Sequence, residues 1–237
     1  MIDTYIALDL ETTGLSPSAD RILEIGAVKV VGGQIAETYE TLVNPGRKIE
    51  KRIEELTGIT DEVAAGGMNT KEAVTGLVEF CGDLPILGHN IIFDYGFVKQ
   101  NAINLNLAFE KEGIDTLKIA RKLFPEMEHR SLQALCGYYG ICPREAHRAA
   151  SDALSAMELY KRMQAQFPDS PEELFAPKAL IYKARKQGPI TPAQKGYLND
   201  LIKYHKITLD KSVDSLTKNE ASRIIDRIIL EYGRIQR

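Results

Sequence analysis

The stretch Tyr5-Ile6-Ala7-Leu8-Asp9-Leu10-Glu11-Thr12-Thr13-Gly14 decides the fold. Its apolar, β-prone start predicts a buried strand, and residues 12–14 predict a turn that ends it. Asp9 and Glu11 share one face of that strand, because side chains at i and i+2 point the same way. Two carboxylates on one face can bind Mg²⁺ or Mn²⁺, which prefer oxygen ligands. Among 33 acidic residues an Asp-x-Glu pair alone means little. Its position at the end of a buried strand makes it informative, because buried charge needs compensation.

The sequence after this strand predicts a mixed sheet. A second strand at 22–31 and the Gly32-Gly33 turn signal lead to a third at 34–43. Short strands follow at 85–88 and near Ile114. One helix is predicted after Thr70, a candidate N-cap, with its apolar residues at 73–80; others are predicted from about 92 and around 117–123, 131–139 and 149–164. A meander followed by alternating strands and helices is typical of an α/β fold. We therefore expect a mixed five-stranded sheet flanked by helices on both faces.

Composition narrows the class of protein. The chain has 237 residues, 44% of them hydrophobic and 27% charged, as expected for a globular protein. No apolar run is long enough to span a bilayer and no export signal begins the chain, so we expect a cytoplasmic protein without a membrane partner. The three cysteines form no CxxC pair, which predicts buried thiols rather than disulfides or a zinc site.

The last quarter of the chain differs in charge from the rest. Residues 177–237 hold 13 Lys and Arg against 6 Asp and Glu, whereas residues 1–176 hold 17 against 27. We predict a body at 1–167, a proline-rich linker at 168–190 with one short helix near 177–185, and a basic helical hairpin at 191–237. Capping boxes at Thr191 and Thr217 predict the starts of its two helices.

The hairpin has several possible roles. It could bind nucleic acid, with Tyr197 or Tyr204 stacking on bases. Docking to a partner protein, or simple stabilisation of the body, is compatible with the same residues. The candidate phosphate contacts are Lys195, Lys203, Lys206, Arg223 and Arg227.

Three further candidate site residues follow later in the chain. Asp94 begins a predicted helix, where an acid is also favoured by the helix dipole alone. His147 precedes another predicted helix and Asp152 lies in its first turn, although a single histidine there is usually an ordinary surface residue. Together, three aspartates and a glutamate can hold two divalent ions roughly 4 Å apart, the arrangement that supports phosphodiester hydrolysis. A nearby histidine is suited to accept a proton near neutrality.

The order of these motifs resembles a known family. Asp-x-Glu-Thr-Thr-Gly, His-Asn-x-x-Phe-Asp and His-x-Ala-x-x-Asp are similar to the three exonuclease motifs of the DEDDh family, over residues 3–165. That family includes the proofreading exonucleases of bacterial DNA polymerase III, ribonuclease T and oligoribonuclease. The resemblance implies a ribonuclease H-like fold, two Mg²⁺ or Mn²⁺ ions and 5′-mononucleotide products.

The resemblance also implies roles for individual residues. Asp9, Glu11, Asp94 and Asp152 would bind the metals, and His147 would be the general base. The residues expected to border the terminal nucleotide are Thr12, Thr13, Gly14, His89, Asn90 and Phe93.

Three functions are compatible with these motifs. We expect a 3′→5′ exonuclease acting on single-stranded 3′ ends of DNA, either alone or with a polymerase subunit as partner. An exoribonuclease acting on RNA ends or oligoribonucleotides is the first alternative. An inactive nucleic-acid-binding module is the second, although its usual mark is a lost acid or histidine and none is lost here.

Overall fold

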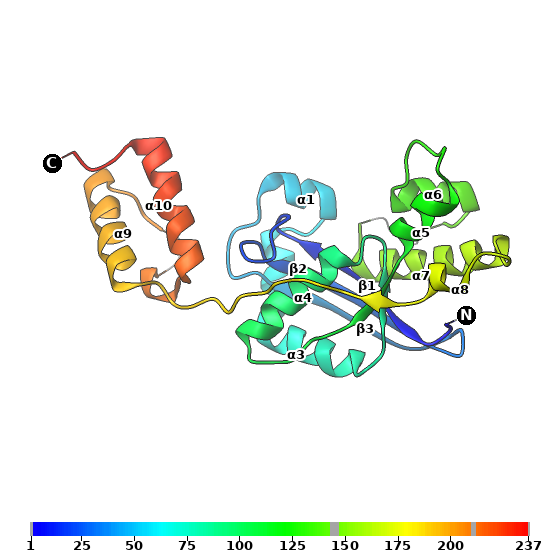
Figure 1. Cartoon of the computed structure of the whole chain (residues 1–237). Coiled ribbons are helices and arrows are strands. Elements are labelled where there is room, and N and C mark those ends of the chain that lie inside the picture. The colour runs from blue at the N-terminus through cyan, green and yellow to red at the C-terminus, as the bar shows by residue number, and fades with distance from the viewer. Residues whose placement is uncertain (1, 143–146, 210–211, 237) are drawn as a thin grey trace. The chain divides into compact units, whose positions relative to one another are not determined.

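The chain forms two compact units, Met1–Ala184 and Arg185–Arg237, each with its own apolar core (Figure 1). The computed structural model describes residues 2–142, 147–209 and 212–236.

An antiparallel meander forms the first part of the sheet in unit 1. β1 (Tyr5–Thr12) pairs with β2 (Ile22–Val31), and β2 pairs with β3 (Gln34–Asn44). Gly32 and Gly33 join β2 to β3 with φ of 57° and 75°. A tight two-residue hairpin turn requires such positive values, and glycine adopts them without strain.

Four shorter strands complete the sheet. β5 (Ile86–Gly88) lies parallel to β1, and β6 (Glu112–Asp115) lies parallel to β5. The outer strands β4 (Met68–Asn69) and β7 (Lys178–Ala179) pair with β3 and β6. Over the described residues the strand order is β4-β3-β2-β1-β5-β6-β7. The predicted α/β fold with a mixed sheet is confirmed. The five predicted strands form its centre, and two edge strands are added, each too short to produce an alternating sequence pattern.

Helices cover both faces of this sheet. Ile6 and Leu8 pack with α3 (Thr70–Cys81) and α4 (Ile92–Asn104) on one face. Tyr5 and Ala7 pack with α7 (Ala149–Gln166) on the other. The alternation along β1 continues to Asp9 and Glu11, which therefore face α7. The other helices of unit 1 are α1 (Lys51–Thr57), α2 (Asp61–Ala65), α5 (Thr116–Leu123), α6 (Leu132–Tyr139) and α8 (Glu172–Phe175).

Unit 2 is a helical hairpin with a small core. α9 (Pro192–His205) and α10 (Lys218–Tyr232) begin at the predicted capping boxes of Thr191 and Thr217, both of which form. A short 3₁₀ helix, η1 (Val213–Ser215), precedes α10. The core is made by Leu198, Leu201, Leu216, Ala221, Ile225 and Ile228.

The segment predicted as a linker is partly ordered on unit 1. Residues 168–184 contain α8 and β7, and β7 pairs with β6. The short helix predicted near 177–185 does not form, because the open edge of β6 supplies backbone hydrogen bonds to an extended segment instead.

Two other sequence predictions concern the cysteines and membrane-spanning segments. Cys81 and Cys136 are buried free thiols as predicted, whereas Cys142 is exposed. Within the described part of the chain, no helix is long and apolar enough to cross a membrane.

Candidate active site

The end of β1 presents the first two acids of the site. Glu11 lies opposite Glu24 of β2, and Asp9 lies opposite Gly26. The pairing register shifts between Glu11 and Thr12, so the pairing of β1 with β2 becomes irregular directly after the second acid. Such irregularities redirect side chains at sheet edges.

Asp94 reaches the same strand from the other side. It lies in the first turn of α4, is 3% exposed, and its Oδ1 accepts a hydrogen bond from the backbone N–H of Leu10 at 3.1 Å. Asp94 is therefore both an acid at a helix N-terminus and a buried group bonded to the strand between Asp9 and Glu11.

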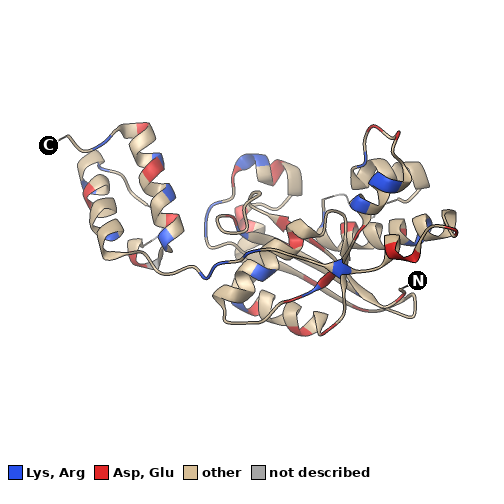
Figure 2. Cartoon of the chain, in the orientation of Figure 1, with Lys and Arg blue, Asp and Glu red and all other residues tan. Residues whose placement is uncertain are grey.

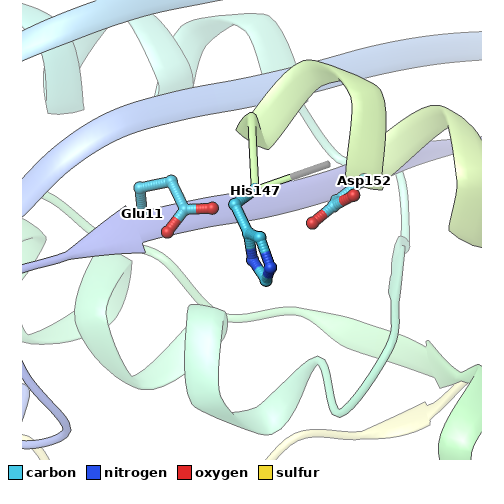
Figure 3. Close-up of side chains that lie close together, drawn as sticks. All are labelled: Glu11, His147 and Asp152. Carbon is cyan, nitrogen blue, oxygen red and sulfur yellow. The ribbon is translucent and has the colours of Figure 1, made fainter. Parts of the chain in front are cut away.

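The start of α7 brings the remaining two residues to Glu11. One carboxylate oxygen each of Glu11 and Asp152 and a ring nitrogen of His147 lie within 4.8 Å of one another. Figure 3 shows the imidazole between the two carboxylates. His147 has a φ of 59°, which is unusual for a residue with a side chain. Its Nε2 lies 3.0 Å from the side-chain nitrogen of Gln133, which orients the ring.

Crowding raises the proton affinity of these acids. Burial raises the pKa of Asp9 well above its ordinary value, and the charges of Asp94, Asp152 and Glu11 raise it further. Burial, followed by the charges of Asp152 and Glu24, raises the pKa of Glu11 to about 7. The pKa values of Asp94 and Asp152 are also raised, chiefly by burial. Ionising all of these acids at once is unfavourable because the carboxylates repel one another and are partly shielded from water. A bound cation would offset this repulsion.

Glu24 and Arg148 hold the start of α7 against the sheet, and sequence reasoning missed both. Glu24 is 1% exposed, and its carboxylate accepts from Arg148 Nε at 2.9 Å, from Arg148 Nη2 at 2.6 Å and from the backbone N–H of Ala149 at 3.0 Å. Because Arg148 lies between His147 and α7, this contact fixes the approach of both site residues. A glutamate inside the apolar run at 22–31 was the available signal, since a buried acid needs a partner.

Gly26 allows the same close approach. A Cβ atom built on it would lie 2.1 Å from the backbone nitrogen of Ala150, which no real contact permits. Glycine within a strand often marks such a meeting of backbones.

The last residue of β1 and the turn that follows it contain three residues predicted to border the substrate. Thr12 Oγ1 donates to the carbonyl oxygen of Gly14 at 2.8 Å. Thr13 is buried, and its Oγ1 accepts from the backbone N–H of Arg21 and from Arg47. A Cβ on Gly14 would collide with the carboxylate of Asp20. These contacts show how the turn is held, and the substrate role of its residues stays a prediction.

The other three lie in the loop after β5 and at the start of α4. His89 bonds through both ring nitrogens, to Thr116 Oγ1 and to the carbonyl of Arg130, each at 2.9 Å. Burial lowers the pKa of His89, which favours its neutral form. Asn90 has a φ of 68°, and Phe93 packs on the ring of Phe97. His89 and Phe93 thus have structural partners, and Asn90 has an unusual backbone conformation. The substrate contacts of these three residues stay a prediction.

The predicted nucleic-acid contacts of the hairpin lie in unit 2. Lys203, Lys206, Arg223 and Arg227 are exposed, whereas Lys195 is partly exposed and forms an ion pair with Asp214. Their role likewise stays a prediction.

A family model described as exonuclease (RNase_T) matches residues 6–160, which include the strand with both acids and the start of α7. The chain belongs to this exonuclease family. Among curated relatives, it is 35% identical to DNA polymerase III subunit epsilon of Aquifex aeolicus, over 66% of this chain and 78% of the relative. It is 36% identical to DNA polymerase III PolC-type of Clostridium perfringens, over 67% of this chain and 11% of that much longer protein. The chain thus spans about a tenth of the length of the PolC-type relatives that it matches.

Solved exonuclease structures share the fold. Exonuclease X in complex with 5′ overhanging duplex DNA superposes with a TM-score of 0.56 and 26% identity, over 73% of this chain and 96% of the other. E. coli exonuclease I in complex with a dT13 oligonucleotide gives a TM-score of 0.63 with 21% identity, over 71% of this chain and 42% of the other. The ribonuclease H-like class inferred from the sequence is therefore confirmed.

Proposed function

We propose that this member of the exonuclease family is a metal-dependent 3′→5′ exonuclease that releases 5′-mononucleotides from DNA. The observation that carries the proposal is the meeting of Glu11, His147 and Asp152 within 4.8 Å beside Asp9 and Asp94. A partly buried cluster of acids with raised pKa values and one histidine is typical of a reaction centre rather than of a stabilising network.

The donor set fits divalent cations. Asp9, Glu11, Asp94 and Asp152 supply carboxylate oxygens, the ligands that Mg²⁺ and Mn²⁺ prefer. Two such ions, when bound, would activate a water molecule and stabilise the charge that develops on the leaving oxygen.

The protein's own groups would orient the water and accept its proton. His147 is the proposed general base, since Gln133 fixes its ring between two carboxylates. The water oxygen would join the phosphorus, the bond from phosphorus to the 3′-oxygen would break, and the water proton would pass to His147. Glu24 and Arg148 would keep His147 and Asp152 in place during this step.

DNA is the proposed substrate because relatives are named DNA polymerase III and two structural neighbours were solved with DNA. The same names support association with a DNA polymerase. The rival functions, exoribonuclease and inactive binding module, share the fold and differ in what the centre cleaves.

Digestion of 5′-labelled DNA and RNA strands of equal sequence with Mg²⁺ separates these functions. The proposal predicts a ladder of shortening labelled DNA and slower loss of RNA. Immediate release of labelled mononucleotide would contradict the 3′→5′ direction, and faster loss of RNA would favour the exoribonuclease. An absence of cleavage in every arm would favour the binding module.

We also propose that unit 2 holds single-stranded nucleic acid through its basic side chains. Lys203→Gln, Arg223→Gln and Arg227→Gln together should weaken binding of long single strands and reduce the salt slope by about 0.7 per lost contact. Lys51→Gln, on the exposed side of α1, is the matched control. An unchanged slope would contradict the role of the hairpin.

A further inference from the structure

A cavity of about 340 Å³ lies in unit 1, beside the β7 edge of the sheet. It opens to solvent and is lined by residues of β6, of α5 and of the segment from α8 through β7. None of the four acids of the active site, nor His147, lines it. Its size is within the range of small-molecule sites. The lining residues are Gly113, Ile114, Asp115, Lys118, Ile119, Arg121, Lys122, Leu174, Ala176, Lys178, Ala179 and Leu180.

The cavity carries positive charge. Lys118, Arg121 and Lys122 come from α5 and Lys178 from β7, and all four are exposed. Asp115 is the one acid among the lining residues. Basic residues on α5 and β7 are visible in Figure 2. This balance favours a ligand that carries a phosphate.

Asp115 offers an unused hydrogen-bond acceptor. It is 7% exposed, and its Oδ1 already accepts from the backbone N–H groups of Asn90, Leu117 and Lys118. Its Oδ2 is buried and has no hydrogen-bond partner in the described structure. Lys118 Nζ lies 3.6 Å from Oδ2, which is too long for a hydrogen bond. The Lys118 side chain is 63% exposed and can rotate away toward an anion. Buried hydrogen-bond acceptors normally have a donor, so Oδ2 is a candidate to accept a hydrogen bond from a ligand.

The remaining wall is apolar. Ile114, Ile119, Leu174 and Leu180 line the cavity with hydrocarbon. A fitting ligand therefore combines an anionic phosphate, an apolar body and an N–H donor. A nucleotide has all three.

We propose that this cavity binds one nucleotide, with the phosphate on the basic residues and a base N–H donated to Asp115 Oδ2. The choice of a nucleotide rests on the proposed nuclease function, whose substrate and product both carry this chemistry. The ligand is either a free mononucleotide or one residue of a bound strand.

Calorimetric titration of the full-length protein with dAMP tests the proposal, in buffer without divalent metal. Under these conditions no metal-dependent hydrolysis occurs, and the uncompensated acids of the active site repel phosphate. We expect dAMP to bind at least tenfold more tightly than deoxyribose 5-phosphate or deoxyadenosine, which lack the base or the phosphate. Titration with tetra-deoxyadenylate is the second arm. If dAMP binds and the tetramer does not, the ligand is a free mononucleotide; if the tetramer binds more tightly than dAMP, the ligand is one residue of a bound strand.

Variants locate the binding. Asp115→Asn keeps the Oδ1 acceptor but places a donor at Oδ2, so we expect a loss of about tenfold or more for dAMP and little change for deoxyribose 5-phosphate. Lys122→Gln with Lys178→Gln changes only exposed side chains and should weaken both phosphate ligands. Lys71→Gln, an exposed lysine on α3 outside the lining set, should bind dAMP like the parent.

Two results would overturn the proposal. One is equal dAMP affinity in the parent and in the Lys122→Gln, Lys178→Gln protein, which remains informative even if Asp115→Asn fails to fold. The other is equal affinity for dAMP and deoxyribose 5-phosphate, which would make the cavity an anion site only. Because the titration needs no cleavage, an inactive protein that binds dAMP here would refute the nuclease proposal and leave this one standing.

Discussion

Arg148 and Glu24 form a two-pronged ion pair that joins the start of α7 to the second strand, 124 residues earlier in the chain. Glu24 also accepts from the backbone N–H of Ala149, so it satisfies a helix N-terminus as well as a guanidinium group. This contact places His147 and Asp152 opposite Glu11. Positioning of the proposed reaction centre thus depends on a buried charge pair outside it.

Removing either partner of that pair should destabilise unit 1. We expect Glu24→Gln to lower the free energy of unfolding by on the order of 2 to 4 kcal/mol, since Arg148 would lose its buried counter-charge. A double-mutant cycle with Arg148→Gln, measured by chemical denaturation, isolates the pair. The exposed pair Lys29–Glu37 is the control and should contribute less than about 1 kcal/mol. Equal coupling energies for the two pairs would contradict the structural role of Glu24.

Substitution of Gly26 should displace α7. Gly26→Ala places a methyl group where the backbone of Ala150 lies. We expect it to lower the free energy of unfolding by about 1–3 kcal/mol and to reduce cleavage. Gly137→Ala in α6 is the control, because a Cβ there would have no atom within 4 Å apart from its chain neighbours and its own helix backbone. That substitution should be neutral or stabilising by up to about 1 kcal/mol. Differential unfolding and single-turnover cleavage measure both effects, and a fully active, fully stable Gly26→Ala protein would refute the close approach.

Stability without metal should fall as pH rises. The pKa of Glu11 is raised to about 7 in the folded protein from an ordinary value of 4.5, so the folded state holds more protons between these values. The free energy of unfolding therefore decreases from about pH 4.5 to pH 7, by at most on the order of 3 kcal/mol from this group. Urea denaturation in EDTA at several pH values measures the slope. Glu11→Gln should flatten it and saturating Mg²⁺ should reduce it, whereas an identical slope in Glu11→Gln would mean that Glu11 titrates normally.

His147 is expected to act in the chemical step. His147→Gln should lower the single-turnover rate about 10²- to 10⁴-fold with little change in strand binding, because a general base contributes to the transition state. It should also remove the rise in rate with increasing pH that a general base produces on the low-pH side of the profile. His129→Gln, at an exposed histidine in the loop before α6, is the matched control. An unaltered rate and profile in His147→Gln would assign the proton transfer to another group.

The fold was largely predictable because its signals are local. The apolar run of β1, the Gly32-Gly33 turn and the two capping boxes each specify geometry within a few residues. The edge strands β4 and β7 were not predictable, since each has two residues and depends on a neighbouring strand edge. The absence of the helix predicted near 177–185 has the same cause.

The sequence indicated which residues the candidate site contains, but not how they are arranged. Motif order indicated Asp9, Glu11, Asp94, His147 and Asp152. It gave no indication that Asp94 accepts from the backbone of Leu10. Glu24 and Gly26 also escaped notice, because a single residue inside an apolar strand reveals its partner only when the chain is folded.

The most direct test of the proposed reaction centre is the single-turnover cleavage rate of 5′-labelled single-stranded DNA with Mg²⁺, for the parent protein and for Glu11→Gln. Glu37→Gln, at an exposed acid on β3, controls for loss of one charge. We predict a ladder from the 3′ end by the parent and by Glu37→Gln, and a rate at least about a hundredfold lower for Glu11→Gln. Equal rates for all three proteins would contradict the assignment of this cluster as the exonuclease centre.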